Sequence, residues 1–164
     1  MLTRLHVLSL RAYERLPTWA RRRVVRTIAP GFIVGAMCFV TRDDGRLLLV
    51  RHLYRAGWGV TGGLVQRGED AADAARRETF EEIGLAVDLE GGEPSVQVDP
   101  EARRVDVIFT ARPAAGIDPD VARPTSPEIV EVGWFLPSEL PALQHETAGA
   151  LAILGRRNLG TVSP

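Results

Sequence analysis

The chain has 164 residues, 45% of them hydrophobic and 25% charged, with a formal net charge of −1. These values are typical of one globular domain with a sizeable core, and they exclude a second full domain and an intrinsically disordered chain. No apolar run approaches the ~18 residues of a membrane helix, and the N-terminus lacks the apolar stretch of a secretory signal. The single cysteine, Cys38, excludes an internal disulfide and a thiolate metal cluster. We therefore expect a cytoplasmic protein.

The charge of the chain changes near residue 30. Residues 1–30 carry seven arginines and one acid, whereas residues 31–164 carry 13 arginines and 20 acids. Apolar residues recur at roughly helical spacing in the first part, which predicts one or two amphipathic helices over residues 2–28, broken near Pro17. We interpret residues 1–30 as a basic helical extension of a domain at residues 31–164. Its arginines are either solvated or contact RNA or an anionic membrane surface.

The next segments predict strands joined by turns. Apolar runs at residues 32–41 and 46–51 flank Asp43-Asp44-Gly45, a pattern typical of a β-hairpin. The glycine-rich residues 52–63 predict a loop with at most a short strand around Val60. Further strands are predicted at residues 85–89, 95–98, 104–111 and 129–136, and a closing helix at residues 138–155.

A helix is predicted over residues 71–83. Asp70 can cap its start, the alanines that follow favour helix, and Gly84 supplies the left-handed residue that often ends one. Along this helix, glutamates recur at i, i+3 and i+4, so that three carboxylates share one face. They are Glu78, Glu81 and Glu82.

Like charges at this spacing destabilise a helix unless something offsets their repulsion. Arg77 can pair with Glu81 four residues later, and a divalent cation is the natural partner for the other carboxylates. Oxygen ligands suit Mg²⁺ or Mn²⁺, ions that usually also bind substrate phosphates. The Gly62-Gly63 pair lets the backbone pass close to a ligand, and Glu69 adds a fourth carboxylate. The alternative is an acidic helix face that only meets water.

Residues 63–85, GLVQRGEDAADAARRETFEEIGL, resemble the Nudix box, G-x5-E-x7-R-E-U-x-E-E-x-G-U, in which U is aliphatic. Thr79 departs from the pattern, because an aliphatic residue is usual there. The preceding residues 58–63, WGVTGG, are similar to the Trp-Gly-Leu-Pro-Gly-Gly approach of the family, with Thr61 in place of proline. The resemblance covers about residues 32–155. The matching box positions are Gly63, Glu69, Arg77, Glu78, Glu81, Glu82, Gly84 and Leu85.

The resemblance implies an α/β (α+β) fold, specifically a Nudix-type α/β/α sandwich with a mixed β-sheet. It also implies a Mg²⁺-dependent pyrophosphatase, a hydrolase acting on the phosphoanhydride bond of a nucleoside diphosphate linked to a moiety X. In such enzymes a bound cation neutralises the diphosphate and lowers the pKa of the attacking water. Mn²⁺ is an expected substitute for Mg²⁺.

The resemblance also implies roles for individual residues. Glu78 and Glu82 are expected to be the main metal ligands and Arg77 to orient the cluster. Either of those two glutamates can be the general base, Glu82 before Glu78. Glu81 and Glu69 are expected to assist in metal binding, and the backbone of Gly63 completes the expected metal set. Bases from outside the box are also known in the family, which keeps Glu101, Asp106 and Glu128 as candidates.

Residues near the glycine-rich loop are candidates for substrate binding. Arg51 and Arg55 can grip phosphate oxygens or be ordinary surface arginines, and Gly62 allows close approach of the backbone. Trp58 can stack on a nucleobase or pack in the core. Asp106 alternates with apolar neighbours in its predicted strand, which favours the solvent face over the pocket.

The leading substrates are ADP-ribose or another nucleotide sugar and (deoxy)nucleoside triphosphates. Pro100 lies 15 residues beyond the box, near where ADP-ribose-hydrolysing members carry a proline, although Asp99-Pro100 also fits an ordinary turn. Two other functions stay open: a nucleotide sensor that does not turn its ligand over, and an RNA 5′-pyrophosphohydrolase that uses residues 1–30 to bind RNA. A homodimer is an open alternative to a monomer, and no membrane span is expected.

Overall fold

The computed structural model describes residues 14–28 and 31–160. Contacts divide the chain into two compact units, residues 1–32 and 33–164. In the first unit, helix α2 (Thr18–Ile28) begins after an irregular stretch at Leu16 and Pro17, which confirms the predicted break. The helix predicted before residue 14 lies outside the described residues. None of the described helices is long and apolar enough to cross a membrane.

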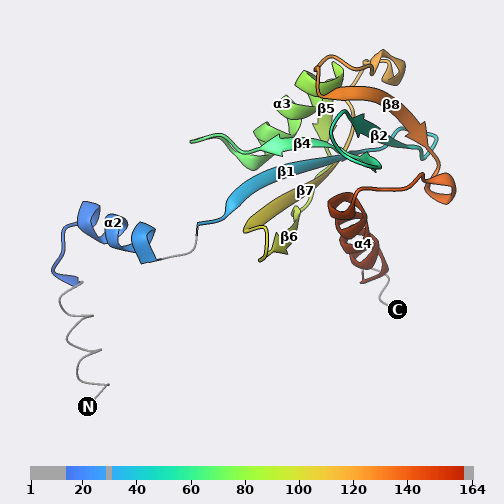
Figure 1. Cartoon of the computed structure of the whole chain (residues 1–164). Coiled ribbons are helices and arrows are strands. Elements are labelled where there is room, and N and C mark those ends of the chain that lie inside the picture. The colour runs from blue at the N-terminus through green and yellow to red at the C-terminus, as the bar shows by residue number, and fades with distance from the viewer. Residues whose placement is uncertain (1–13, 29–30, 161–164) are drawn as a thin grey trace. The chain divides into compact units, whose positions relative to one another are not determined.

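The second unit holds two β-sheets, of five and three strands (Figure 1). In the larger sheet the order is β4-β1-β7, and β5 and β6 both pair with β7 at different positions along it. The pairing of β1 with β7 is parallel and the other pairings are antiparallel, so this sheet is mixed. The smaller sheet is antiparallel, in the order β3-β2-β8. The strands are β1 (Ile33–Val40), β2 (Leu47–His52), β3 (Trp58–Gly59), β4 (Thr61–Leu64), β5 (Val87–Leu89), β6 (Ser95–Asp99), β7 (Arg104–Pro113) and β8 (Ile129–Phe135).

The predicted hairpin of β1 and β2 is wrong, although both strands and their tight turn exist. The strands share only an isolated bridge between Thr41 and Leu47, after which β1 pairs with β4 and β7 while β2 pairs with β3 and β8. The reason is burial, because residues 35–40 and 47–50 are buried without alternation. Strands of this kind are covered on both faces and occupy the interior of a sheet, where each needs two neighbours.

Helix α3 (Ala71–Ile83) has the predicted bounds. The Asp70 side chain accepts a hydrogen bond from the Ala72 amide at 2.8 Å, and Gly84 ends the helix with a φ of 70°. The closing helix α4 (His145–Gly160) begins later than predicted. The intervening residues form a single 3-10 turn at Pro137–Glu139 and an irregular stretch that contains Pro141, and prolines at such spacing interrupt an α-helix.

Helices α3 and α4 cover opposite sides of the strands (Figure 1). On one side, Ala74, Ala75 and Ile83 of α3 pack against one face of β1 and β2. On the other side, Met37 and Phe39 pack with α4. The predicted α/β/α sandwich with a mixed sheet is therefore confirmed. The glycine-rich segment predicted as a loop contributes β3 and β4, which the glycines had concealed.

Candidate active site

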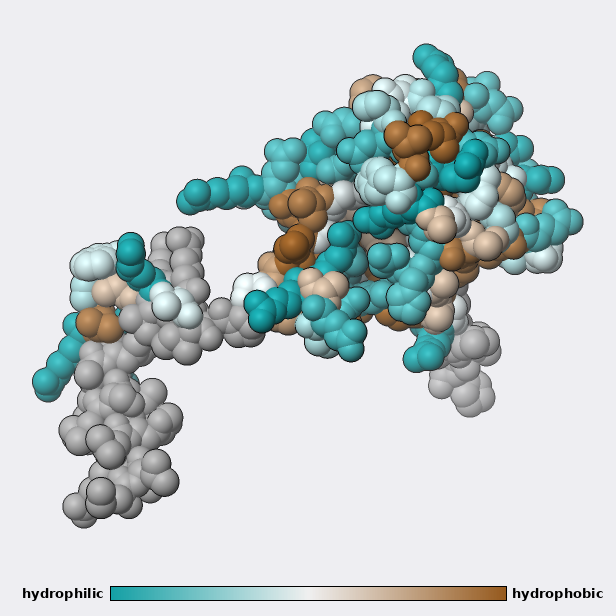
Figure 2. All heavy atoms as spheres, viewed as in Figure 1, coloured by the Kyte–Doolittle hydropathy of each residue, from teal (hydrophilic) through white to brown (hydrophobic). Residues whose placement is uncertain are grey.

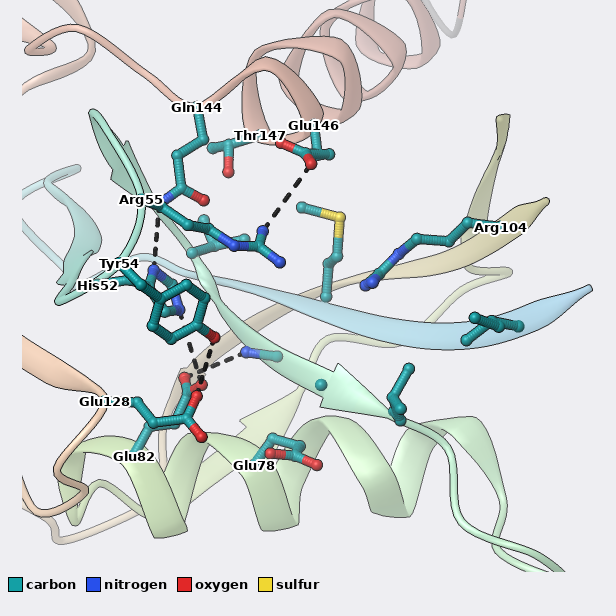
Figure 3. Close-up of a pocket in the computed structure, with 16 residues that line it drawn as sticks. His52, Tyr54, Arg55, Glu78, Glu82, Arg104, Glu128, Gln144, Glu146 and Thr147 are labelled. Atoms are coloured by element: carbon teal, nitrogen blue, oxygen red, sulfur yellow. Dashed lines mark hydrogen bonds and ion pairs between the residues drawn. The ribbon is translucent and has the colours of Figure 1, made fainter. Parts of the chain in front are cut away.

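A cavity of about 580 Å³ opens between the larger sheet, α3 and the start of α4 (Figure 3). Glu78 and Glu82 reach it from α3, and His52 and Tyr54 reach it from the end of β2 and the loop after it. Four of its ten charged or polar side chains are glutamates and two are arginines. The charged and polar side chains that line it are His52, Tyr54, Arg55, Glu78, Glu82, Arg104, Glu128, Gln144, Glu146 and Thr147.

Glu82 is the most buried carboxylate of the box, with 7% of its surface exposed. Burial raises its pKa to about 8, and the Gly62 amide, which donates a hydrogen bond to Oε2 at 3.3 Å, opposes this shift. Its Oε1 lies 3.9 Å from Nε2 of His52. Burial also lowers the pKa of His52, so the imidazole is neutral at pH 7. The Gln144 amide nitrogen lies 3.1 Å from Nδ1 of His52, and the other ring nitrogen, Nε2, faces Glu82.

Glu78 lies against Gly63, and this contact explains the glycine. A Cβ atom at residue 63 would lie 2.4 Å from Cδ of Glu78, and one at Gly62 would lie 2.2 Å from the carbonyl oxygen of Ala36. Only glycines allow β4 to pass this close to both β1 and the carboxylate of α3. The close backbone approach predicted for Gly62-Gly63 is therefore present.

Arg77 donates hydrogen bonds to the other three glutamates of the box. Its Nε lies 2.7 Å from Oε1 of Glu69, and its Nη1 lies 2.7 Å from Oε1 of Glu78 and 3.0 Å from Oε2 of Glu81. The predicted pair of Arg77 with Glu81 is confirmed. Hydrogen bonds, first to Glu69, raise the pKa of Arg77, and the same guanidinium lowers the pKa of Glu69. Arg77 thus offsets the repulsion among these carboxylates and fixes the orientation of Glu78. The Glu81 side chain is half exposed outside the cavity.

The carboxylates in the cavity fit a hard cation whose coordination shell is completed by waters and substrate oxygens. In the described part of the chain, no three His, Cys, Asp or Glu side chains converge closely enough to hold a metal unaided. Mg²⁺ does not need them, because it usually takes one or two carboxylates and fills its shell with waters and substrate phosphates. Glu78 and Glu82 are two such carboxylates on one cavity wall (Figure 3).

The three candidate bases outside the box lie in different places. Glu128 faces the cavity and accepts a hydrogen bond from the Tyr54 hydroxyl at 2.9 Å. Glu101 is exposed in the turn between β6 and β7, where Pro100 also lies. Asp106 is only 3% exposed, so its predicted solvent-facing position is wrong. Arg104, two residues earlier on the same strand, binds Asp106 and allows its burial.

Two of the four residues expected to bind substrate line the cavity, and two do not. Arg55 and Gly62 line the cavity, and Arg55 lies 3.9 Å from Glu146. Arg51 instead bonds Glu131 at 2.8 Å across β2 and β8. Trp58 packs edge to face against Phe135, with ring centroids 4.9 Å apart, and does not line the cavity. Packing, the alternative given for Trp58, is what the structure shows.

Four charged or polar cavity residues were missed in the sequence: Arg104, Gln144, Glu146 and Thr147. No spacing marks Gln144 or Glu146, which reach the cavity only because the chain turns back after β8. One signal could have found Arg104: opposite charges at i and i+2 in an apolar strand place Arg104 and Asp106 on one face, where they can pair.

Comparison with known proteins identifies the family. The NUDIX domain profile matches residues 31–153. A MutT-like protein of Streptomyces ambofaciens is 29% identical over 114 residues, which are 70% of either chain. The crystal structure of a MutT NUDIX hydrolase from Burkholderia pseudomallei is 28% identical with a TM-score of 0.59, covering 76% of this chain and 99% of that one. An ADP-ribose pyrophosphatase from Streptococcus suis is 24% identical with a TM-score of 0.60, covering 78% and 92%.

These matches cover the unit that carries the cavity and the glutamates of α3. Enzymes of this type are pyrophosphatases that act on phosphorus-containing acid anhydrides, generally use a divalent metal and bind nucleotide derivatives as substrates. The chain belongs to the Nudix hydrolase family.

Proposed function

We propose that the protein is a Mg²⁺-dependent hydrolase that cleaves the phosphoanhydride bond of a nucleoside diphosphate linked to a moiety X. ADP-ribose or another nucleotide sugar and (deoxy)nucleoside triphosphates are the leading substrates. One observation carries the proposal: Glu78 and Glu82 lie in the wall of a cavity of about 580 Å³, beside the close-packed Gly62-Gly63 backbone. A site of this size and charge suits a nucleotide only when a cation neutralises its phosphates.

Glu78 and Glu82 would hold the cation, with Gly63 beside them and Glu69 and Glu81 acting through Arg77. When bound, the cation supplies neutralising charge and makes a water molecule more acidic. Arg77 holds Glu78 in place through the 2.7 Å bond, and the glycines leave room for the carboxylate.

A general base must lie within reach of the attacking water. Glu82 is the first candidate, because its carboxyl group lies in the cavity wall, where a bound cation would favour the ionised form that accepts a proton. Glu78 is the second, and Glu128 stays a candidate because it faces the same cavity. Glu101 is exposed in the turn between β6 and β7 and does not line the cavity.

We place the activity in the domain at residues 31–164 and treat residues 1–30 as an extension outside it. The enzyme is proposed to act on small nucleotides as a monomer or homodimer. RNA or membrane contact through residues 1–30 stays a less favoured alternative. The cytoplasmic location expected from the sequence also stays a prediction.

A substrate panel tests the proposal. The purified protein is incubated with ADP-ribose, nucleotide sugars, nucleoside triphosphates, dinucleoside polyphosphates and a 5′-triphosphorylated RNA, with Mg²⁺ or with excess EDTA, and products are identified by mass. We expect Mg²⁺-dependent release of a nucleoside monophosphate, or of a monophosphate and pyrophosphate, from one class of small nucleotide. Tight binding without turnover would replace the proposal with a nucleotide sensor, and turnover of RNA alone would indicate the RNA enzyme.

A further inference from the structure

The cavity wall formed by β1 and β7 contains an ion pair between Arg104 and Asp106, with Gly35 beside it. Asp106 is 3% exposed, and both of its carboxylate oxygens accept hydrogen bonds from Nε of Arg104 at 2.8 Å. Nη2 of Arg104 also lies 2.8 Å from Oδ1. Gly35, the register partner of Asp106 on β1, leaves the space for this pair, because a Cβ there would lie 2.2 Å from Oδ1 and 2.6 Å from Nη2. Any side chain at residue 35 would displace the pair.

A buried charge pair inside a strand is costly, and apolar residues of similar volume often stabilise such a position better. The Nε and Nη2 edge of Arg104 is occupied by Asp106. The described residues offer no hydrogen-bond partner to its other edge, which Nη1 and Nη2 form and which carries two parallel N–H donors. Arg104 lines the cavity, and Figure 3 shows its guanidinium directed inward from the side opposite His52 and Tyr54.

Apolar side chains flank this position. Ile33, the register partner of Arg104, and Leu64 at the end of β4 both line the cavity, and each is 53% exposed. Apolar surface gathers at the edge of the domain where β1 begins and β4 ends (Figure 2). Exposed apolar residues at the rim of a polar cavity are typical of a surface that a ligand covers.

We propose that Arg104 is a substrate-binding residue that determines specificity, and that Asp106 and Gly35 are positioning residues for it. The open edge of its guanidinium binds two adjacent acceptor atoms in a part of the substrate other than the diphosphate held near Glu78 and Glu82. The inference rests on the proposed function, because it concerns the same cavity. Two parts of such a nucleotide offer this chemistry: an acceptor pair on a base, such as O6 and N7 of guanine, and an anionic group of X.

The test substitutes lysine for arginine. Arg104→Lys keeps a positive charge beside the buried Asp106, which protects the fold, but loses the planar pair of donors. Arg112→Lys is the matched control, since Arg112 is on the same strand and pairs with Asp43 and Glu90 on the surface. Binding is measured by calorimetry with α,β-methylene analogues, in which a carbon bridge replaces the scissile oxygen. One arm compares the GDP and ADP analogues, and the other compares the ADP, ATP and ADP-ribose analogues.

We expect Arg104→Lys to weaken binding of the probe with the acceptor pair by about 10-fold and to change the others by less than about 2-fold. Asp106→Asn should reduce the same discrimination, and Arg112→Lys should leave all affinities unchanged. A change in the first arm identifies the base, and a change in the second identifies X. Equal affinities of wild type and Arg104→Lys, a uniform loss over all probes, or no binding by wild type would overturn the proposal. Hydrolysis is measured separately, so normal binding without turnover contradicts only the proposed function.

Discussion

Glu82 combines burial with a pKa of about 8, and this combination links the site to the stability of the fold. Between its unfolded pKa near 4.5 and the folded value, the folded protein keeps a proton that the unfolded chain has released. Unfolding therefore releases a proton in this window, and this group lowers the free energy of unfolding as the pH rises from about 5 to 8. A residue placed for stability alone would not behave in this way.

Glu82→Gln should therefore stabilise the metal-free protein, and more so at high pH. In EDTA, we expect the Tm of the variant to match wild type at pH 5 and to exceed it by roughly 5 °C at pH 8.5, because only wild type must deprotonate a buried group. Differential scanning calorimetry over this pH range measures the difference. A Tm difference between variant and wild type that does not change with pH would contradict the pKa assigned to Glu82.

Thr79 and Thr61, which both depart from the family pattern, are partners in the structure. Their hydroxyls lie 2.8 Å apart in the core, and Thr79 also donates to the carbonyl of Ala75 at 2.8 Å. Both side chains are fully buried. Each threonine thus supplies a hydrogen-bond partner to the other.

Single and double replacements of the two threonines test this contact. Thr61→Val or Thr79→Val leaves one buried hydroxyl with a lost partner, and each should reduce the free energy of unfolding by about 1 to 2 kcal/mol. The double variant should lose less than the sum, with a coupling of about 1 kcal/mol by urea denaturation. Strict additivity would show that the contact contributes nothing.

At the scale of elements, the close fit of β4 on α3 sets the position of Glu78. Gly63→Ala should displace the Glu78 carboxylate, because the new Cβ would lie within 2.4 Å of its Cδ. We expect Mg²⁺-dependent turnover to fall by at least ~10-fold while the Tm changes little, since the end of a flexible side chain can move. Gly155→Ala in α4 is the control, because nothing lies within 4 Å of that position. Equal activity of the two variants would show that this contact is not needed.

Elements with local signals were predictable, and their pairing was not. Asp70, the alanines and Gly84 define α3 by themselves, because caps and propensity act within a few residues. The separation of β1 and β2 into two sheets depends on burial by distant residues, which no local turn reveals. The box glutamates were found from spacing and resemblance. Gln144, Glu146 and Thr147 were missed because only the fold brings them to the cavity, whereas the charge pair at i and i+2 could have indicated Arg104.

At the scale of the whole molecule, the cavity lies entirely in the unit at residues 33–164. Deletion of residues 1–30 should therefore leave kcat for small nucleotides within about 2-fold of wild type, because no cavity residue is lost. Steady-state kinetics of the full and shortened proteins, with circular dichroism as the control for folding, measure the effect. A selective loss of RNA turnover in the shortened protein would instead assign an RNA-binding role to the extension.

The central claim is that Glu78 and Glu82 hold the cation that makes hydrolysis possible. Its most direct test is the rate of Mg²⁺-dependent hydrolysis by Glu82→Gln, beside Glu139→Gln, which removes a carboxylate exposed in the 3-10 turn. We predict a loss of ~2 to 4 orders of magnitude for Glu82→Gln, with the fold retained, and no loss for the control. Full activity of Glu82→Gln would contradict the assignment of the site.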